Sequence, residues 1–214
     1  MIDGYGYTRL LKRLWRGQVH RGGLVRLLVR LVVSRATPRT ALGSWWPEAF
    51  ARYLTGFASG DLASLAAAAA QDIAADLRPE MRAALAAERS RGAELWLVSA
   101  TVDLLAEAVA DELHFDRCLC TVLQRTGGRF TGRLAGPICR GAEKLRRVQT
   151  EATGLGIAPD FQISSYYADG FEDLPLLEAV GRPHAVHPDE RLAHVARQRG
   201  YILIGAPRRH RAGG

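Results

Sequence analysis

Cysteine is scarce in this sequence of 214 residues, and its scarcity limits where the protein can work. The three cysteines, Cys118, Cys120 and Cys139, form an odd and sparse set that argues against a disulfide framework. We interpret them as small buried hydrophobic residues, because free cysteine is among the most buried residue types. Proteins without disulfides are typical of reducing compartments, so the composition predicts a cytoplasmic protein.

Long hydrophobic runs are also absent. The most apolar early segment, residues 24–33, is interrupted by Arg26 and Arg30 and is too short to span a bilayer. The N-terminal residues do not follow the pattern of a secretory signal peptide. The sequence therefore predicts neither a transmembrane helix nor a secreted protein.

Lysine is nearly absent, since Lys12 and Lys144 are the only lysines among 29 basic residues. The net charge of +7 is concentrated near the start, where residues 1–40 hold nine basic residues and one acid, Asp3. Such a segment could lie on an anionic membrane or bind phosphates. We favour helices that pack their apolar side on the domain, with only weak anionic membrane contact through residues 9–39 and no specific nucleic-acid binding.

The pattern of apolar residues changes near residue 92. Residues 9–91 are helix-prone and contain no convincing strand, whereas the remainder alternates short apolar strands with helices. This alternation predicts an α/β fold with a parallel sheet and helices on its faces. Gly127 and Gly128 predict a hairpin turn. The expected strands are 94–99, 117–123, 129–134, 161–167, 184–187 and 201–204, and the expected helices are 102–113, 140–153 and 174–180.

The most informative stretch is residues 166–192, YYADGFEDLPLLEAVGRPHAVHPDERL. An apolar strand ends just before Asp169, and Asp173 follows at the start of a Leu-rich helix closed by Gly181. Pro188 is expected in the first turn of the next helix. The two carboxylates therefore lie where a strand passes into a helix, which in an open α/β sheet is the crevice where ligands bind. A helix cap and a first-turn acid would explain the same pair without any function.

This stretch resembles the fourth motif of haloacid dehalogenase-like (HAD) phosphatases, in the branch (subfamily IB) that resembles phosphoserine phosphatase. The family pattern is a strand, GDSxxD, a Leu-rich helix and a short strand ending in NPD. Here it stands as ADGFED followed by HPD, so that Asp169 and Asp173 match the two family aspartates. Ala168, Gly170 and His187 replace the family glycine, serine and asparagine, and Gly170 removes a hydroxyl from the hydrogen bonds expected there.

Two further stretches carry the same resemblance. LWLVSAT, at residues 95–101, resembles the second motif, which implies that Ser99 and the neighbouring amide of Ala100 hold a phosphoryl oxygen. FTGRLAGPICRGAEKLRRV, at residues 130–148, resembles the hairpin and third motif, and Lys144 falls on the motif lysine. A cation is needed there because it offsets the repulsion between an anionic nucleophile and a phosphate.

The resemblance implies Mg²⁺-dependent hydrolysis of a small-molecule phosphate monoester through an aspartyl-phosphate. Lys144, Ser99 and Asp173 would be the catalytic residues, and Ser99, Ala100 and Lys144 would bind the phosphate. Asp169 would bind Mg²⁺, which prefers oxygen ligands, and Asp173 would orient the surrounding groups. A non-catalytic relative that binds phosphate or a membrane surface is the alternative.

One family element is not found in the sequence. Family members begin with a strand ending in DxDxT, whose first aspartate is the nucleophile and whose second is the general acid and base. The sequence contains no DxD, and its start, MIDGYGYTRLL, resembles the residues that follow this motif. We therefore expect a chain that lacks the first central strand of the sheet and is inactive as it stands.

The expected organisation is a HAD-like Rossmannoid core with an inserted all-helical cap. We assign residues 5–91 to the cap, residues 92–206 to the α/β core and residues 207–214 to a basic, disordered tail. In the family the cap lies over the crevice, which implies that it selects the substrate.

Overall fold

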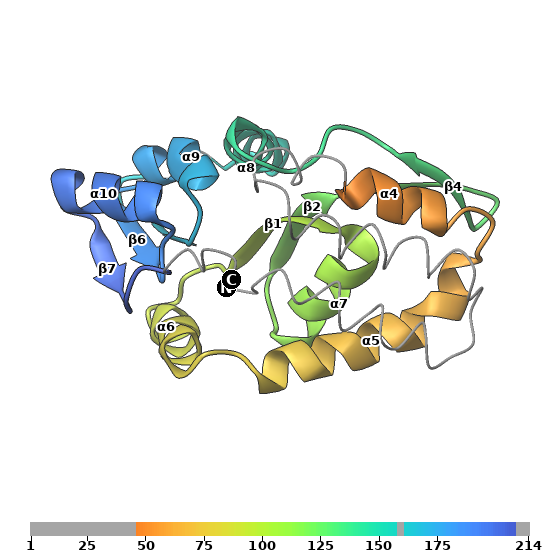
Figure 1. Cartoon of the computed structure of the whole chain (residues 1–214), viewed down its shortest axis with the longest axis horizontal. Coiled ribbons are helices and arrows are strands. Elements are labelled where there is room, and N and C mark those ends of the chain that lie inside the picture. The colour runs from red at the N-terminus through yellow and green to blue at the C-terminus, as the bar shows by residue number, and fades with distance from the viewer. Residues whose placement is uncertain (1–45, 158–160, 209–214) are drawn as a thin grey trace, which may run out of the picture. The chain divides into compact units, whose positions relative to one another are not determined.

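The computed structural model describes residues 46–157 and 161–208, which form two compact units with separate cores (Figure 1). We call residues 46–77 and 88–138 the hairpin unit. Residues 78–87, 139–157 and 161–208 form the other unit, which we call the motif unit. The basic segment 9–39 lies outside the described residues, so its helices and its membrane contact stay predictions.

The hairpin unit contains a strand–helix–strand arrangement and an antiparallel hairpin. Its elements are α4 (Trp46–Tyr53), α5 (Ser59–Ala75), β1 (Trp96–Val102), α7 (Asp103–Glu112), β2 (Arg117–Thr121), β3 (Leu123–Thr126) and β4 (Arg129–Leu134). β1 and β2 run parallel, and α7 connects them. β3 and β4 run antiparallel around Gly127 and Gly128, which both have a positive φ, so the predicted hairpin turn is confirmed.

The spacing of buried residues in α5 explains how the hairpin unit packs. Its buried side chains recur at the interval of a single helix face, and this face packs against α7. Most of them are alanines, whose small size lets the two helices approach closely. The largest side chains of the core they join are Phe50, Leu54, Leu62, Leu105, Leu123 and Phe130.

The motif unit contains a parallel sheet with the strand order β5–β6–β7. Its elements are α8 (Ala142–Gly154), β5 (Ser165–Ala168), the 3₁₀ helix η1 (Phe171–Asp173), α9 (Leu174–Ala179), β6 (Arg182–Val186), α10 (Glu190–Arg199) and β7 (Ile202–Ile204). A further helix, α6 (Pro79–Ser90), begins in this unit and ends in the hairpin unit. The order of β5, η1 and α9 places the Asp169–Asp173 loop directly after the first strand of this sheet.

Small residues on the sheet determine how helices cover the motif unit. Ala168 of β5 and Ala185 of β6 are paired and fully buried. They lie in one core cluster with Leu177 of α9 and with Leu192 and Ala196 of α10. Because alanine projects little from the sheet, both helices can pack directly onto the strands and hold the connecting loops in place.

The alternating strands and helices confirm the predicted α/β fold with parallel sheets, although several element boundaries differ from the expected ones. The expected strand 117–123 divides at Val122 into β2 and β3. β5 begins only at Ser165, later than expected. Pro188 was wrongly placed in a first helical turn, because Asp189 caps α10 and its Oδ1 accepts the amide of Leu192 at 2.8 Å.

β1 and β5 are among the strands that have an open edge in the part of the chain that the structure describes. Among these residues β1 has a strand neighbour on one edge only, and so does β5. An open edge presents backbone donors and acceptors that another strand can pair. β1 and β5 are the strands that we expect to flank a further central strand, and this strand stays a prediction.

Residues 9–91 are expected to be helical, and the part of this range that the structure describes, from residue 46 on, is helical. Residues 46–91 contain α4, α5 and α6 and no strand, although Ala58 forms an isolated bridge with Arg129. Their role as a cap stays a prediction. None of the described helices is both long and apolar enough to cross a membrane.

Candidate functional site

Lys144 and Asp173 form a buried ion pair in the motif unit. The Nζ of Lys144 lies 2.7 Å from the Oδ1 of Asp173, and the two residues are only 8% and 5% exposed. Lys144 lies in the first turn of α8, whereas Asp173 ends η1 and directly precedes α9. The fold therefore brings together two of the residues that the motifs mark as catalytic.

Tyr166, a residue that the motif patterns do not mark, contacts the same ammonium group. Its hydroxyl oxygen lies 3.2 Å from the Nζ of Lys144. Burial acts to lower the pKa of Lys144, but Tyr166 and Asp173 together raise it above the ordinary lysine value, so the ammonium stays charged. Burial raises the pKa of Tyr166, so its phenol stays protonated at neutral pH.

The start of α8 is held against η1, and this contact keeps Lys144 beside Asp173. Arg140, just before α8, forms an ion pair with Glu172 of η1. Gly141 has a φ of 56°, a backbone conformation that glycine adopts without strain, and it turns the chain directly into α8. The ion pair and the glycine turn together fix the position from which Lys144 reaches the loop.

Asp169 lies in the loop between β5 and η1, and Arg208 pairs with its carboxylate. The guanidinium of Arg208 lies 2.5 Å from the Oδ2 of Asp169 and also donates to the Asp169 carbonyl at 3.1 Å. The amide of Arg208 donates to the carbonyl of Pro188 at 2.8 Å. Arg208, which we assigned to the basic tail, is therefore fixed beside the predicted metal-binding carboxylate.

Asp189, the last residue of the HPD segment, shapes the loop that carries Asp169. Its Oδ2 accepts the amide of Phe171 at 2.8 Å, and its own amide donates to the Asp169 carbonyl at 2.8 Å. His187 has a structural role, because its Nε2 lies 2.5 Å from Glu80 Oε1 and its Nδ1 lies 3.2 Å from a backbone carbonyl. The segment thus supports the site through a carboxylate rather than through its histidine.

The chemistry of Asp169 fits Mg²⁺ as a single protein ligand. Mg²⁺ is typically bound through one or two carboxylates together with substrate phosphates and several retained waters. Within the described ranges, no group of three or more His, Cys, Asp or Glu side chains could hold a metal ion. The Arg208 guanidinium occupies one oxygen of this carboxylate, so a cation that binds there must compete with it.

Arg208→Gln is expected to strengthen divalent cation binding about fivefold, because a partly exposed ion pair that competes for Asp169 contributes up to about 1 kcal/mol. The measurement is a Mn²⁺ titration of the full chain, followed by electron paramagnetic resonance. Arg197→Gln is the matched control, since Arg197 is an exposed arginine of α10. Equal strengthening in both variants would show that net charge, and not the contact with Asp169, controls binding.

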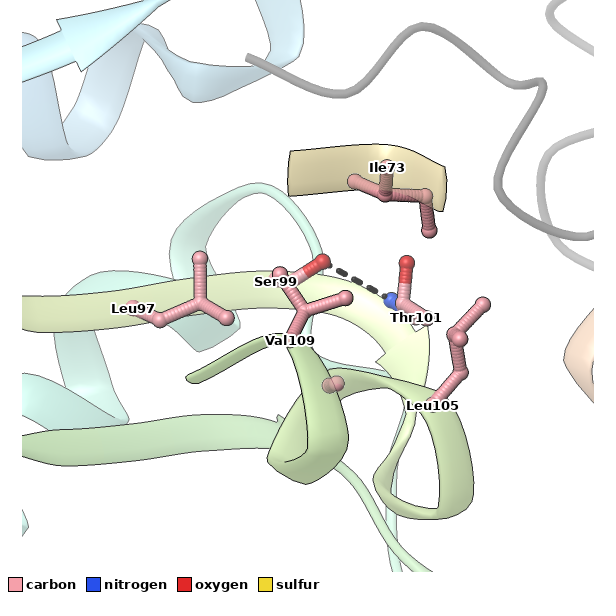
Figure 2. A pocket seen from close by; sticks show the side chains of 7 residues that line it. Ile73, Leu97, Ser99, Thr101, Leu105 and Val109 are labelled. Carbon is pink, nitrogen blue, oxygen red and sulfur yellow. Dashed lines mark hydrogen bonds between the residues drawn. The ribbon is translucent and has the colours of Figure 1, made fainter. Parts of the chain in front are cut away.

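Ser99 and Ala100 lie in the hairpin unit, where β1 departs from regular pairing with β2. The register between the two strands shifts after Val98. Figure 2 shows the hydroxyl of Ser99 accepting a hydrogen bond from the amide of Thr101, at 3.1 Å. The buried Thr121 hydroxyl donates to the Ala100 carbonyl at 2.9 Å. The irregular segment is thus fixed by side-chain hydrogen bonds.

The side chains of Ser99 and Thr101 also line a small hollow that is otherwise apolar (Figure 2). Its volume is about 10 Å³, which is close to the space that one water molecule needs. The hollow is therefore too small to be a substrate pocket. Its other lining residues come from β1, α5 and α7, and they are Ile73, Leu97, Leu105, Ala106 and Val109.

The predicted site residues thus divide between the two units. Lys144, Asp173 and Asp169 lie in the motif unit, the first two in direct contact and the third in the adjoining loop. Ser99 and Ala100 belong to the hairpin unit. The catalytic and binding roles of all five residues stay predictions.

The sequence also identifies the class of protein to which this fold belongs. Residues 7–178 match the haloacid dehalogenase-like hydrolase family, and the chain belongs to this family. The resemblance that the three motifs indicate is thereby confirmed.

Individual relatives place the chain near phosphoserine phosphatases. It is 37% identical over 112 residues to the phosphoserine phosphatase SerB1 of Mycobacterium tuberculosis, covering 52% of this chain and 36% of that protein. It is 32% identical over 124 residues to a phosphoserine phosphatase of Polaromonas sp., covering 56% of this chain and 52% of that protein. The chain therefore spans about a third to a half of the length of these two relatives.

Solved structures support the same fold. A protein of unknown function from Bordetella pertussis Tohama I superposes with a TM-score of 0.76 and 25% identity, over 94% of this chain and 90% of that one. A substrate-bound phosphoserine phosphatase superposes with a TM-score of 0.54 and 14% identity, over 92% of this chain and 85% of that one. At such low identity the second likeness supports the fold alone.

Proposed function

We propose that this protein is a HAD-family phosphatase that hydrolyses a small-molecule phosphate monoester with the help of Mg²⁺. The observation that carries the proposal is the buried ion pair of Lys144 and Asp173, next to the loop that presents Asp169. Burying an ion pair costs desolvation free energy that the attraction between the charges often fails to offset. A buried charge pair beside a strand end is therefore more typical of a functional site than of a stabilising device.

Each predicted residue has a distinct task in the proposed reaction. Lys144 places a positive charge against the phosphoryl group, and Asp173 holds its ammonium in position. Ser99 and Ala100 bind a phosphoryl oxygen, and Asp169 would hold the Mg²⁺. When bound, Mg²⁺ supplies positive charge that stabilises the phosphoryl group during transfer. Since two relatives are named phosphoserine phosphatases, phosphoserine is the first substrate to test.

The chain of 214 residues is expected to show no phosphatase turnover, because its sequence contains no DxD segment to supply the nucleophile. The measurement is release of product from a generic aryl phosphate with Mg²⁺ present, compared with a Lys144→Ala control. Turnover well above that control would mean that another residue acts as the nucleophile, and Asp3 would be the first to test.

A second candidate function is phosphate binding without catalysis, and the absence of a DxD segment favours it for the chain as it stands. Inorganic phosphate would then bind in the presence of Mg²⁺ without being produced from any monoester.

Weak contact of residues 9–39 with anionic membranes would be a separate property. Its affinity should fall steeply as the salt concentration rises, because released counterions drive such binding.

A further inference from the structure

Tyr166 contacts the ammonium of the Lys144–Asp173 pair. It belongs to β5, three residues before Asp169, and packs against the core cluster of the motif unit. Its hydroxyl oxygen accepts a hydrogen bond from the ammonium of Lys144. The Nζ of Lys144 is 3.2 Å from the hydroxyl oxygen but 6.0 Å from the ring centroid, so the contact is with the hydroxyl rather than with the ring face.

Two neighbouring groups hold the ammonium of Lys144. The phenol oxygen of Tyr166 accepts an N–H from Lys144. The same ammonium forms an ion pair with the Oδ1 of Asp173, at 2.7 Å. A lysine ammonium has three N–H donors, so these two partners among the described residues leave the third for a ligand. About a tenth of the Lys144 side chain remains exposed, which leaves an approach to it.

We propose that Tyr166 is a positioning residue for Lys144, which it holds with Asp173 so that one N–H remains directed to a bound phosphoryl group. This inference rests on the proposed function. Asp173 alone would let the ammonium rotate about the final C–N bond, whereas two fixed acceptors determine the direction of the third N–H.

A phenol suits this task better than a second carboxylate. Because burial keeps the phenol protonated, Tyr166 supplies a hydrogen-bond acceptor without adding negative charge. A second carboxylate in its place would leave Lys144 surrounded by two negative charges and unable to attract a phosphate dianion. Tyr166 therefore orients Lys144 while the positive charge remains available for a substrate.

The test uses the full chain labelled with nitrogen-15 lysine, which gives at most two Nζ signals because the sequence has only Lys12 and Lys144. Tyr166→Phe removes the hydroxyl and keeps the ring. We expect hydrogen exchange at the Nζ of Lys144 to become about tenfold faster, because a net hydrogen bond to a charged group is lost. Inorganic phosphate added with Mg²⁺ should shift the Lys144 signal, with an affinity about five- to tenfold weaker in the variant.

Tyr167→Phe is the matched control, because Tyr167 is the next residue of β5 and stacks on His184 with a ring-centroid distance of 4.1 Å. Its side chain lies on the opposite face of the strand, so its loss should leave the Lys144 signal unchanged. Unchanged exchange at Lys144 in Tyr166→Phe, with both variants melting like the parent chain, would overturn the proposal. If phosphate fails to bind even the parent chain, the proposed function falls, while altered exchange in Tyr166→Phe alone still supports the positioning role.

Discussion

Asp173→Ala is expected to lower the free energy of unfolding by about 3 to 5 kcal/mol, because it leaves the buried ammonium of Lys144 without its ionic partner. Removing one member of a buried ion pair lowers the free energy of unfolding far more than removing both, since the remaining charge is desolvated and unpaired. The measurement is equilibrium unfolding in urea, from the shift in midpoint at constant slope.

The matched control is the double variant Lys144→Met, Asp173→Leu, which removes both charges and keeps apolar volume. It should lose less stability than Asp173→Ala alone. If the double variant is the less stable of the two, packing rather than the unpaired charge explains the loss, and the pair is not the electrostatic centre that we describe.

The pH dependence of stability should report the same pair. The pKa of Lys144 is raised on folding, so its contribution is fully present below the ordinary lysine pKa of 10.5 and is lost only as the pH rises through the higher folded value. The difference in unfolding free energy between the parent chain and the double variant Lys144→Met, Asp173→Leu should therefore stay constant across neutral pH and shrink only in strongly alkaline solution.

Asp169→Asn should have the largest effect on catalysis once the nucleophile is supplied. In a chain extended at its N terminus by an apolar strand and a DxDGT segment, we expect this change to lower turnover about 100-fold or more and to raise the Mg²⁺ concentration needed. The substitution keeps the shape of the side chain but removes the charge that we propose binds the cation. The measurement is initial rate against Mg²⁺ concentration.

Two further substitutions define how specific that effect is. Asp173→Asn should disturb the Mg²⁺ titration less, because Asp173 forms its ion pair with Lys144 and is not expected to bind the metal directly. Asp111→Asn, an exposed change on α7, should leave it unaltered. An Asp169→Asn enzyme with the parent Mg²⁺ titration would show that this loop does not bind the metal.

The sequence predicted the order of elements because each signal was local. Apolar runs predicted the strands, and the Leu-rich segment after Asp173 predicted α9. The same segment predicted that Asp169 and Asp173 follow a strand, since strand and helix boundaries depend on neighbouring residues. Pro188 was misplaced because Asp189, an equally good local signal, caps the helix instead.

The contacts within the site could not be predicted because they join distant segments. The local sequence pattern indicates only that Tyr166 belongs to a buried strand. Its contact with Lys144 depends on where the fold places α8. Arg208 looked like part of a basic tail, yet the fold places it on Asp169. Asp189 carried a usable signal, since the HPD segment matches a family motif, but its bond to the Phe171 amide depends on tertiary structure.

The central claim is that this chain provides the phosphate- and metal-binding residues of a HAD phosphatase, and the most direct test is the activity of the extended chain with its DxDGT segment. We expect Mg²⁺-dependent hydrolysis of an aryl phosphate that is lost on chelation and on replacement of Lys144 by alanine. A folded extended chain that binds Mg²⁺ but releases no phosphate, or whose turnover survives Lys144→Ala, would contradict the claim.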